Sequence, residues 1–311
     1  GYWDLLAYRT LAGMGLGGEF GIGMALIAEV WPANKRNRAS AWVGMGWQLG
    51  VLMAAFITPL LLDIIGWRGM FLVGLLPALA SFVIRRGMGE PDAFTEHVDV
   101  NQGLSFSARI KLLFADVATT KASIGIFILC SVQNFGYYGL MIWMPSYLST
   151  TFGFSLTKSG LWTAVTVVGM TFGIWLFGLL ADRFARWKIF LIYQVGAVVM
   201  VVVYAQLQDP TVMLFTGALM GMFVNGMIGG YGALISDTYP VKVRATAQNV
   251  LFNLGRGVGG FGPLVIGLLV SQWSFAAAIT LLALIYVLDI VATLFLLPKK
   301  QSNDDVLGAI G

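Results

Sequence analysis

Long apolar stretches separated by short polar ones dominate the chain. About nine of these stretches reach roughly 20 residues, the length that a helix needs to cross the ~30 Å hydrocarbon core of a bilayer. Polar residues do not alternate with apolar ones, and lipid forbids open sheet edges, so the pattern predicts helices. We expect spans near residues 3–31, 39–62, 67–84, 122–149, 159–181, 189–207, 211–236, 247–270 and 275–297.

A short cassette occurs twice, at residues 29–36 and 237–244. Each copy reads acid, any residue, aromatic, proline, three residues, arginine, and each lies between two apolar stretches. An internal repeat is informative because it fixes the architecture before any single residue is interpreted. Here it predicts two related helical bundles in one chain, a construction that many secondary transporters share.

Aligning the two cassettes places the spans of 3–84 against those of 211–297, whereas the spans of 122–207 have no counterpart upstream. A complete pair of bundles would need about 90 more residues, or three spans, before Gly1. We therefore expect three helices of an N-terminal bundle at 1–84 and a polar linker at 85–121. A six-helix bundle at 122–298 and a tail at 299–311 complete the predicted organisation.

The composition agrees with a lipid environment. Of the 311 residues 58% are hydrophobic and 11% are charged, against about 25% charged in soluble domains. The net charge of +4 could suggest nucleic acid, but the placement of the charges argues against that partner. The loops between the spans fall into two alternating sets, one on each side of the membrane. One set holds only two basic residues, Arg68 and Lys158. The other set holds fifteen: Lys35, Arg36, Arg38, Arg85, Arg86, Arg109, Lys111, Lys121, Arg183, Arg186, Lys188, Lys242, Arg244, Lys299 and Lys300.

This asymmetry follows the positive-inside rule, so the basic side is expected to face the cytoplasm. The linker 85–121 and the C-terminus then lie inside, residue 1 lies outside, and the chain belongs in an inner membrane. Cys130 is the single cysteine and cannot form an internal disulfide. With one histidine, His97 in the linker, and no P-loop or nucleophile elbow, we expect no metal, no cofactor and no enzyme.

Two motifs carry a resemblance to a known family. Residues 178–186, Gly-Leu-Leu-Ala-Asp-Arg-Phe-Ala-Arg, resemble the G-x-x-x-D-R-x-G-R loop of the major facilitator superfamily, departing at Ala185 where glycine is usual. Residues 9–19, which begin with arginine and end in Gly-Gly-Glu, resemble its fourth-helix motif and, with the first cassette, look like bacterial symporters of organic acids such as sialate, lactate and aromatic acids. The resemblance implies an all-α membrane fold whose spans are helices four to twelve of twelve.

Charged residues inside a bilayer are costly and are therefore functional candidates. Arg256 shares a helix face with Asn249, Asn253 and Gly260, and its planar guanidinium suits a carboxylate. Arg9 is the second candidate for anion binding; the alternative is an arginine that reaches the membrane surface from the outer end of its helix. Glu19 is the candidate proton carrier, because desolvation raises the pKa of a buried carboxyl; a structural ion pair is the alternative.

Polar and aromatic residues within the spans are candidates to line a substrate cavity. A glycine-broken segment surrounds several of them, which suits a site near the membrane midplane; packing between helices is the alternative for each. The candidates, in addition to Asn253, are Gln48, Gln133, Asn134, Tyr137, Tyr138 and Asn225.

Charges on the basic side have a separate expected role. In the resembling family, such charges hold the two bundles together at the cytoplasmic side and separate during alternating access. Exposed salt bridges contribute only about 0–1 kcal/mol each, which suits a contact that must open. The predicted gating residues are Glu29, Arg36, Asp182, Arg183, Arg186, Asp237 and Arg244.

Together these observations favour a monomeric secondary transporter that takes up a small organic anion with protons. A sugar or drug transporter of the same superfamily is one alternative. Another is a non-transporting remnant or membrane assembly partner, since the first three helices expected for the first bundle are missing from the sequence. Substrate identity and the direction of transport are not encoded in any motif.

Overall fold

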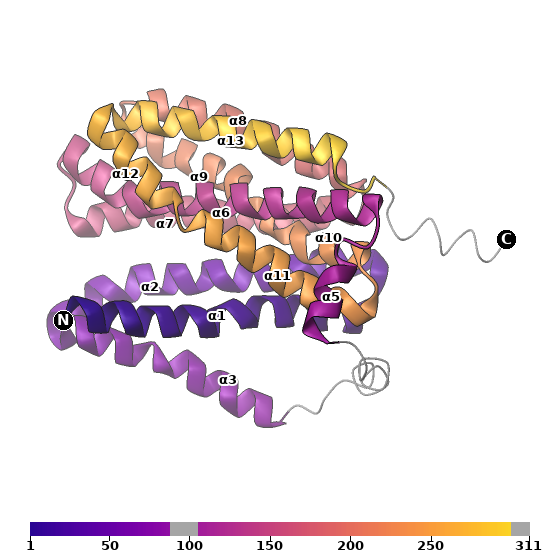
Figure 1. The fold of residues 1–311 in the computed structure, drawn as a ribbon. Helices are drawn as coiled ribbons and strands as arrows, with labels where there is room; N and C mark the ends of the chain where they lie inside the picture. The colour runs from indigo at the N-terminus through magenta and orange to yellow at the C-terminus, as the bar shows by residue number, and fades with distance from the viewer. Residues whose placement is uncertain (88–104, 300–311) are drawn as a thin grey trace.

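A computed structural model describes residues 1–87 and 105–299, and Figure 1 shows its helices. His97 lies outside these ranges. Every regular element of the described residues is helical. The elements are α1 (Tyr2–Val30), a 3-10 turn (Ala33–Lys35), α2 (Arg36–Val73), α3 (Leu75–Gly87), α5 (Phe106–Leu112), α6 (Val117–Phe152), α7 (Leu156–Ala181), α8 (Arg186–Gln206), α9 (Pro210–Gly226), α10 (Ile228–Thr238), α11 (Val241–Gly259), α12 (Gly262–Gln272) and α13 (Phe275–Phe295).

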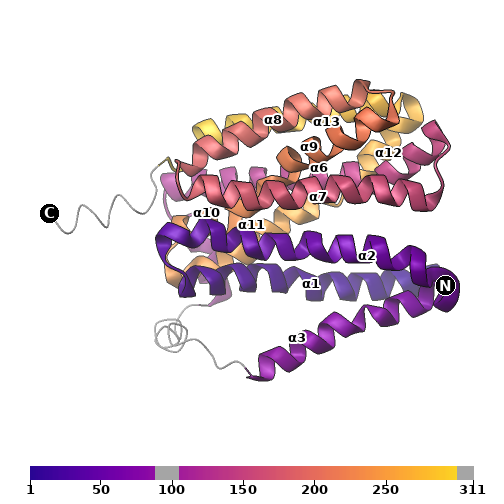
Figure 2. The ribbon, with the colours of Figure 1, turned by 180° about the vertical axis from the view of Figure 1, so that it is seen from behind.

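Eight helical segments among the described residues are long and apolar enough to cross a membrane. The longest, Ala33–Ile84, has 52 residues and would measure about 78 Å as one straight helix, more than twice the ~30 Å hydrocarbon core. The segment is broken at Gly66, where φ is 65° and ψ is 174°, a conformation that glycine adopts readily because it lacks a Cβ. Figures 1 and 2 show the chain turning back between α2 and α3. The segment therefore supplies two spans, in agreement with the nine expected.

The helices form two groups in both views (Figures 1 and 2). Helices α1, α2 and α3 lie on one side, and the helices from α6 to α13 form a second, larger group. The groups meet where α1 contacts α11 and where α2 contacts α7 and α10. At one end of the molecule α1 and α10 finish, and α2, α8 and α11 begin. We call it the linker end, because α5, which belongs to the expected linker 85–121, lies there. The opposite end carries the Gly66 turn.

Glycine allows two helices of the larger group to approach until their backbones touch. A Cβ added at Gly169 or Gly173 of α7 would collide with the backbone of Ala218 or Met222 of α9. Small residues at such positions stabilise helix pairs in membranes because lipid supplies no hydrophobic force between helices. Close packing of α7 on α9 holds the larger group together behind the interface with α2.

We expect Gly173→Ala to destabilise the protein, because the added methyl group collides with the α9 backbone and overpacking costs about 1–3 kcal/mol. Gly160→Ala on the same helix is the matched control, since no atom lies within 4 Å of its added Cβ. Thermal unfolding in detergent, followed by intrinsic fluorescence, measures both. A Gly173→Ala melting temperature at or above that of the wild type would contradict this account of the contact.

Candidate functional site

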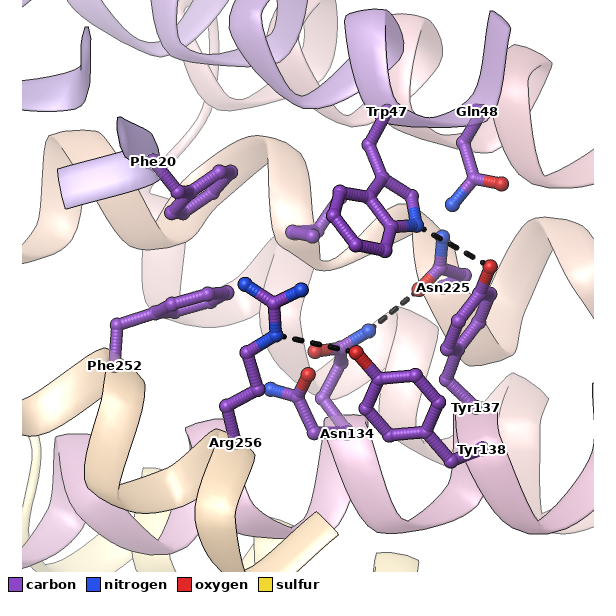
Figure 3. Close-up of a pocket in the computed structure, with 11 residues that line it drawn as sticks. Phe20, Trp47, Gln48, Asn134, Tyr137, Tyr138, Asn225, Phe252 and Arg256 are labelled. Carbon is purple, nitrogen blue, oxygen red and sulfur yellow. Dashed lines mark hydrogen bonds between the residues drawn. The ribbon is translucent and has the colours of Figure 1, made fainter. Parts of the chain in front are cut away.

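A narrow pocket of about 20 Å³ lies between the two helix groups, with room for little more than a water molecule in this conformation (Figure 3). Both groups contribute side chains, from α1 and α2 on one side and from α6, α9, α10 and α11 on the other. Its lining residues are Phe20, Trp47, Gln48, Gln133, Asn134, Tyr137, Tyr138, Asn225, Ile228, Phe252 and Arg256.

The pocket lies deep within the spans. Phe20 is ten residues from the end of α1 at Val30, or about 15 Å along the helix. Trp47 is eleven residues from the start of α2 at Arg36, or about 17 Å. Half of a ~30 Å hydrocarbon core is about 15 Å, so these residues place the pocket near the middle of the membrane.

Arg256 is the positive charge of this pocket. Its Nε donates a hydrogen bond to the Tyr138 hydroxyl over 3.1 Å, and its Cζ lies 4.6 Å from the centroid of the Trp47 ring. No carboxylate of a described residue lies within 4.0 Å of its nitrogens. In Figure 3 its terminal nitrogens point into the space between Phe20 and Trp47. The guanidinium is thus held by neutral partners and keeps its charge free for an anion.

Aromatic rings form the walls around this charge. Phe20 of α1 stacks on Phe252 of α11 with ring centroids 4.2 Å apart. Tyr137 and Tyr138 meet edge to face at 5.2 Å, and Trp47 Nε1 donates a hydrogen bond of 3.3 Å to the Tyr137 hydroxyl. Such rings present flat apolar surface with few rotatable bonds, so the pocket offers planar walls beside one cation.

Buried amides supply the remaining polar groups. Gln133 Nε2 donates to Asn225 Oδ1, and Asn134 Nδ2 donates to the Cys130 carbonyl of its own helix over 2.8 Å. Gln48 Oε1, Gln133 Oε1 and Asn225 Nδ2 are buried without a hydrogen-bond partner. An unpaired buried polar atom costs about 1–3 kcal/mol, and a polar ligand would recover part of that cost.

The structure brings most of the predicted cavity residues together. Asn253 stands beside the pocket rather than in its lining, because its Nδ2 donates to the Gly17 carbonyl over 2.6 Å and joins α11 to α1. Phe20, Trp47 and Phe252 line the pocket but were not predicted from the sequence. An aromatic residue in a span packs against lipid, helix or substrate alike, and nothing in its neighbours along the chain distinguishes the three.

The other two predicted membrane charges lie elsewhere. Arg9 is eleven residues before Phe20 on α1, about 16 Å away along the helix, and lines a separate pocket with Trp67 and Arg68 at the Gly66 end. Glu19 is exposed on α1 and lines neither pocket. Arg256 is therefore the one of the three charges that the structure places among the predicted cavity residues.

At the linker end, the two cassettes are joined to each other. Arg36 of the first cassette pairs with Asp237 of the second. Arg186 at the start of α8 joins the same carboxylate, with Nη2 2.6 Å from Asp237 Oδ2, and its Nε donates to Asn37 Oδ1 over 2.6 Å. This cluster connects the start of α2 to α8 and α10, and so ties one helix group to the other.

A second contact lies beside this cluster. Arg38 Nε is 3.3 Å from Asp182 Oδ2, and Asn37 Nδ2 donates to the Ala181 carbonyl over 3.1 Å. Burial raises the pKa of Asp182, although the nearby Asn37 and Arg38 act in the opposite direction. Helices α2 and α7 are thereby joined at their ends.

The remaining predicted gating residues stand outside these contacts. Arg183 is exposed and makes no ion pair with a described residue. Arg244 Nε donates to the Ser236 carbonyl over 3.0 Å, and the side chain of Glu29 lies outside the described residues. Arg36, Asp182, Arg186 and Asp237 thus gather at the linker end, and we call these four residues with Arg38 the latch.

We expect Asp237→Asn to loosen the latch, because one substitution removes the charge that holds both Arg36 and Arg186. A hydrogen bond to a charged group contributes about 1.5–3 kcal/mol, so the linker end should open at least about tenfold more often. The labelling rate of Ser40→Cys, a buried position just inside the latch, measures the opening in a Cys130→Ser background. Arg183→Gln is the control, and equal rates in Asp237→Asn and Arg183→Gln would contradict the latch.

Asp182 gives a pH dependence of known sign. Its raised pKa means that the folded protein binds this proton more tightly than the unfolded chain does. Through this group, the folded state gains stability as the pH falls through the raised pKa. The melting-temperature difference, wild type minus Asp182→Asn, should therefore grow from about pH 7 to about pH 4. A difference that shrinks over this range would contradict the assignment.

Comparison with known proteins gives consistent matches. The profile of the Major Facilitator Superfamily matches residues 1–208 and 126–309. A putative metabolite transport protein of Haemophilus influenzae is 61% identical over 97% of this chain and 75% of its own length. A cis,cis-muconate transport protein of Acinetobacter baylyi is 26% identical over 94% of this chain and 72% of its own length. A solved proton:xylose symporter has the same fold, with a TM-score of 0.75 at 18% identity over 97% of this chain and 73% of that one.

Proposed function

The chain belongs to the major facilitator superfamily, and from this premise we propose that it carries a small organic anion across the membrane together with protons. Membership makes it a multi-pass membrane transporter of a small molecule and excludes the enzyme class. The observation that supports an anion is Arg256, a cation near the membrane midplane with no carboxylate of a described residue beside it.

The substrate proposed is a carboxylate with a flat, largely apolar body. A guanidinium binds a carboxylate through two parallel hydrogen bonds, and the two terminal nitrogens of Arg256 point into the pocket. Trp47, Phe20 and Phe252 offer flat surface to the body of the molecule. The unpaired Gln48 and Gln133 oxygens accept a hydroxyl or amide proton if the substrate carries one. The muconate relative supports this class, since its name describes the transport of an unsaturated acid.

Transport would proceed by rocking of the two helix groups around the pocket. The groups share few polar contacts apart from the latch and the pocket, so separating α2 from α7, α8 and α10 exposes the pocket from the linker end. By the placement of the basic residues, we assign the linker end, the segment 85–121 and the C-terminus to the cytoplasm of an inner membrane. The conformation described here then has its cytoplasmic side closed.

Roles for the other two charges follow from their positions. Arg9 with Arg68 lines a pocket at the Gly66 end, which this orientation places outside. Two positive charges there would attract an anion before it reaches Arg256. Glu19 is exposed and lines neither pocket, so the burial from which we predicted its role as proton carrier is not present in this conformation.

The test is uptake by the purified protein in proteoliposomes, with radiolabelled cis,cis-muconate, nicotinate and benzoate as probes. We expect uptake of at least one acid, abolished by a protonophore. Arg256→Ala should lower the uptake efficiency by about 10- to 100-fold, since hydrogen bonds to a charged group contribute about 1.5–3 kcal/mol. Arg256→Lys should recover only part of it, because an ammonium cannot make the two parallel bonds.

Arg183→Gln serves as the matched control because this arginine is exposed and outside the pocket. Uptake of the acids unchanged by Arg256→Ala would overturn the role of that residue. Uptake of a neutral sugar, independent of Arg256, would instead support the sugar transporter that the sequence left as an alternative.

A further inference from the structure

One carboxyl in the larger helix group is buried inside a membrane span. The face of α13 that packs on its neighbours contains Ile279, Leu282, Tyr286, Asp289 and Thr293, at helical spacing. Asp289 has no exposed surface. It lies six residues before the helix ends at Phe295, about 9 Å from that end, so its carboxyl is within the span rather than at the membrane surface.

This carboxyl has no polar partner among the described residues. Neither Asp289 oxygen has a hydrogen bond to them, and none of their lysine, arginine or histidine side chains lies within 4.0 Å of it. An ionised carboxylate is costly at such a position, and a buried group without a partner is neutralised by taking up a proton.

The other titratable groups around Asp289 do not supply a positive charge. Cys130 of α6 and Tyr231 of α10 lie within electrostatic reach, as does Tyr286 on its own helix. Helix α12 contains no titratable residue. On α8, Arg186 pairs with Asp237, Lys188 is exposed, and Tyr193 and Tyr204 donate to the Gly173 carbonyl and Met144 Sδ.

Asp289 is linked to the pocket through packing. Tyr286, one turn earlier on α13, places its hydroxyl against Gly136 of α6, and any Cβ at Gly136 would collide with that oxygen. Gly136 lies between Gln133 and Tyr137, which line the pocket from the same helix. Helix α13 thus packs directly behind the pocket wall.

The Tyr286 hydroxyl is itself buried without a hydrogen-bond partner. Close packing of α13 on α6 therefore requires the Tyr286 hydroxyl and the Asp289 carboxyl to remain without water or another hydrogen-bond partner. A neutral Asp289 tolerates this arrangement, whereas an ionised one requires water or a cation and would draw α13 away from α6. Protonation of Asp289 and the position of the pocket wall are for this reason coupled.

We propose that Asp289 is a proton-binding site of the transport cycle, protonated in the latched conformation and releasing its proton when the linker end opens. The step is the dissociation of one carboxylic acid into a carboxylate and one proton, which leaves with the water that enters. The proposal rests on the proposed proton coupling, but its test does not depend on the substrate.

Infrared spectroscopy of the reconstituted protein at neutral pH detects this proton directly, because a protonated carboxyl has a C=O stretching band that a carboxylate lacks. We expect the band in the wild type, its loss in Asp289→Asn, and its retention in Asp182→Asn and Asp63→Asn. In Asp237→Asn, whose latch is broken, we expect the band to fall in proportion to the open population that the Ser40→Cys labelling measures, and Arg183→Gln should leave it unchanged.

Absence of the band in the wild type would show an ionised Asp289 and overturn the proposal, even if Asp289→Asn fails to fold. A band that Asp237→Asn leaves unchanged, while the Ser40→Cys labelling shows the linker end mostly open, would also overturn it, since the carboxyl would then be neutral in both conformations. Failure of the proposed function has a different signature, namely wild-type uptake of the acids that no protonophore affects.

Discussion

The absence of water from the hydrocarbon core is the constraint on which the rest of the structure depends. Every polar group in a span must find a partner in the protein or remain unpaired at a cost. Most do find one, such as Tyr231, whose hydroxyl donates to the Leu129 carbonyl. The exceptions include Gln48, Gln133 and Asn225 at the pocket, and Asp289, but also Ser159, Gln194 and Gln248 elsewhere in the helices. An unpaired polar atom is thus not by itself evidence of function, and the pocket is marked by the charge of Arg256 as well.

The same constraint explains why the latch lies where it does. Ionic contacts between the helix groups occur at the linker end, where water can solvate Arg36, Asp182 and Asp237 once they separate. The contacts across the pocket contain no ion pair and are made through aromatic side chains, such as Trp47 with Tyr137 and Arg256 with the Trp47 ring. A transporter that opens and closes repeatedly needs contacts of this kind, because separating a charge pair inside lipid would leave two charges without water, at a high cost.

The helices and the polar residues of the pocket could be predicted from the sequence, because the first depend on hydropathy and the second are residue types that lipid excludes. Gln48 and Asn225 stand out for that reason. Phe20 and Trp47 do not, because aromatic residues are equally suited to lipid, packing and ligand. Arg9 shows the other limit. Its charge marks it as unusual, but only the structure shows that Arg9 and Arg256 line different pockets. Asp289 is likewise recognisable in the sequence as a charge within a span, but only the structure shows that no described residue pairs with its carboxyl.

The pairing of Arg36 with Asp237 joins the arginine of one cassette to the acid of the other copy. The three charges of this contact are not equivalent. Loss of Arg36 would leave Asp237 paired with Arg186, whereas loss of Asp237 would leave both arginines without this carboxylate. The contact between the two copies of the repeat therefore depends on the acid of the second copy more than on the arginine of the first.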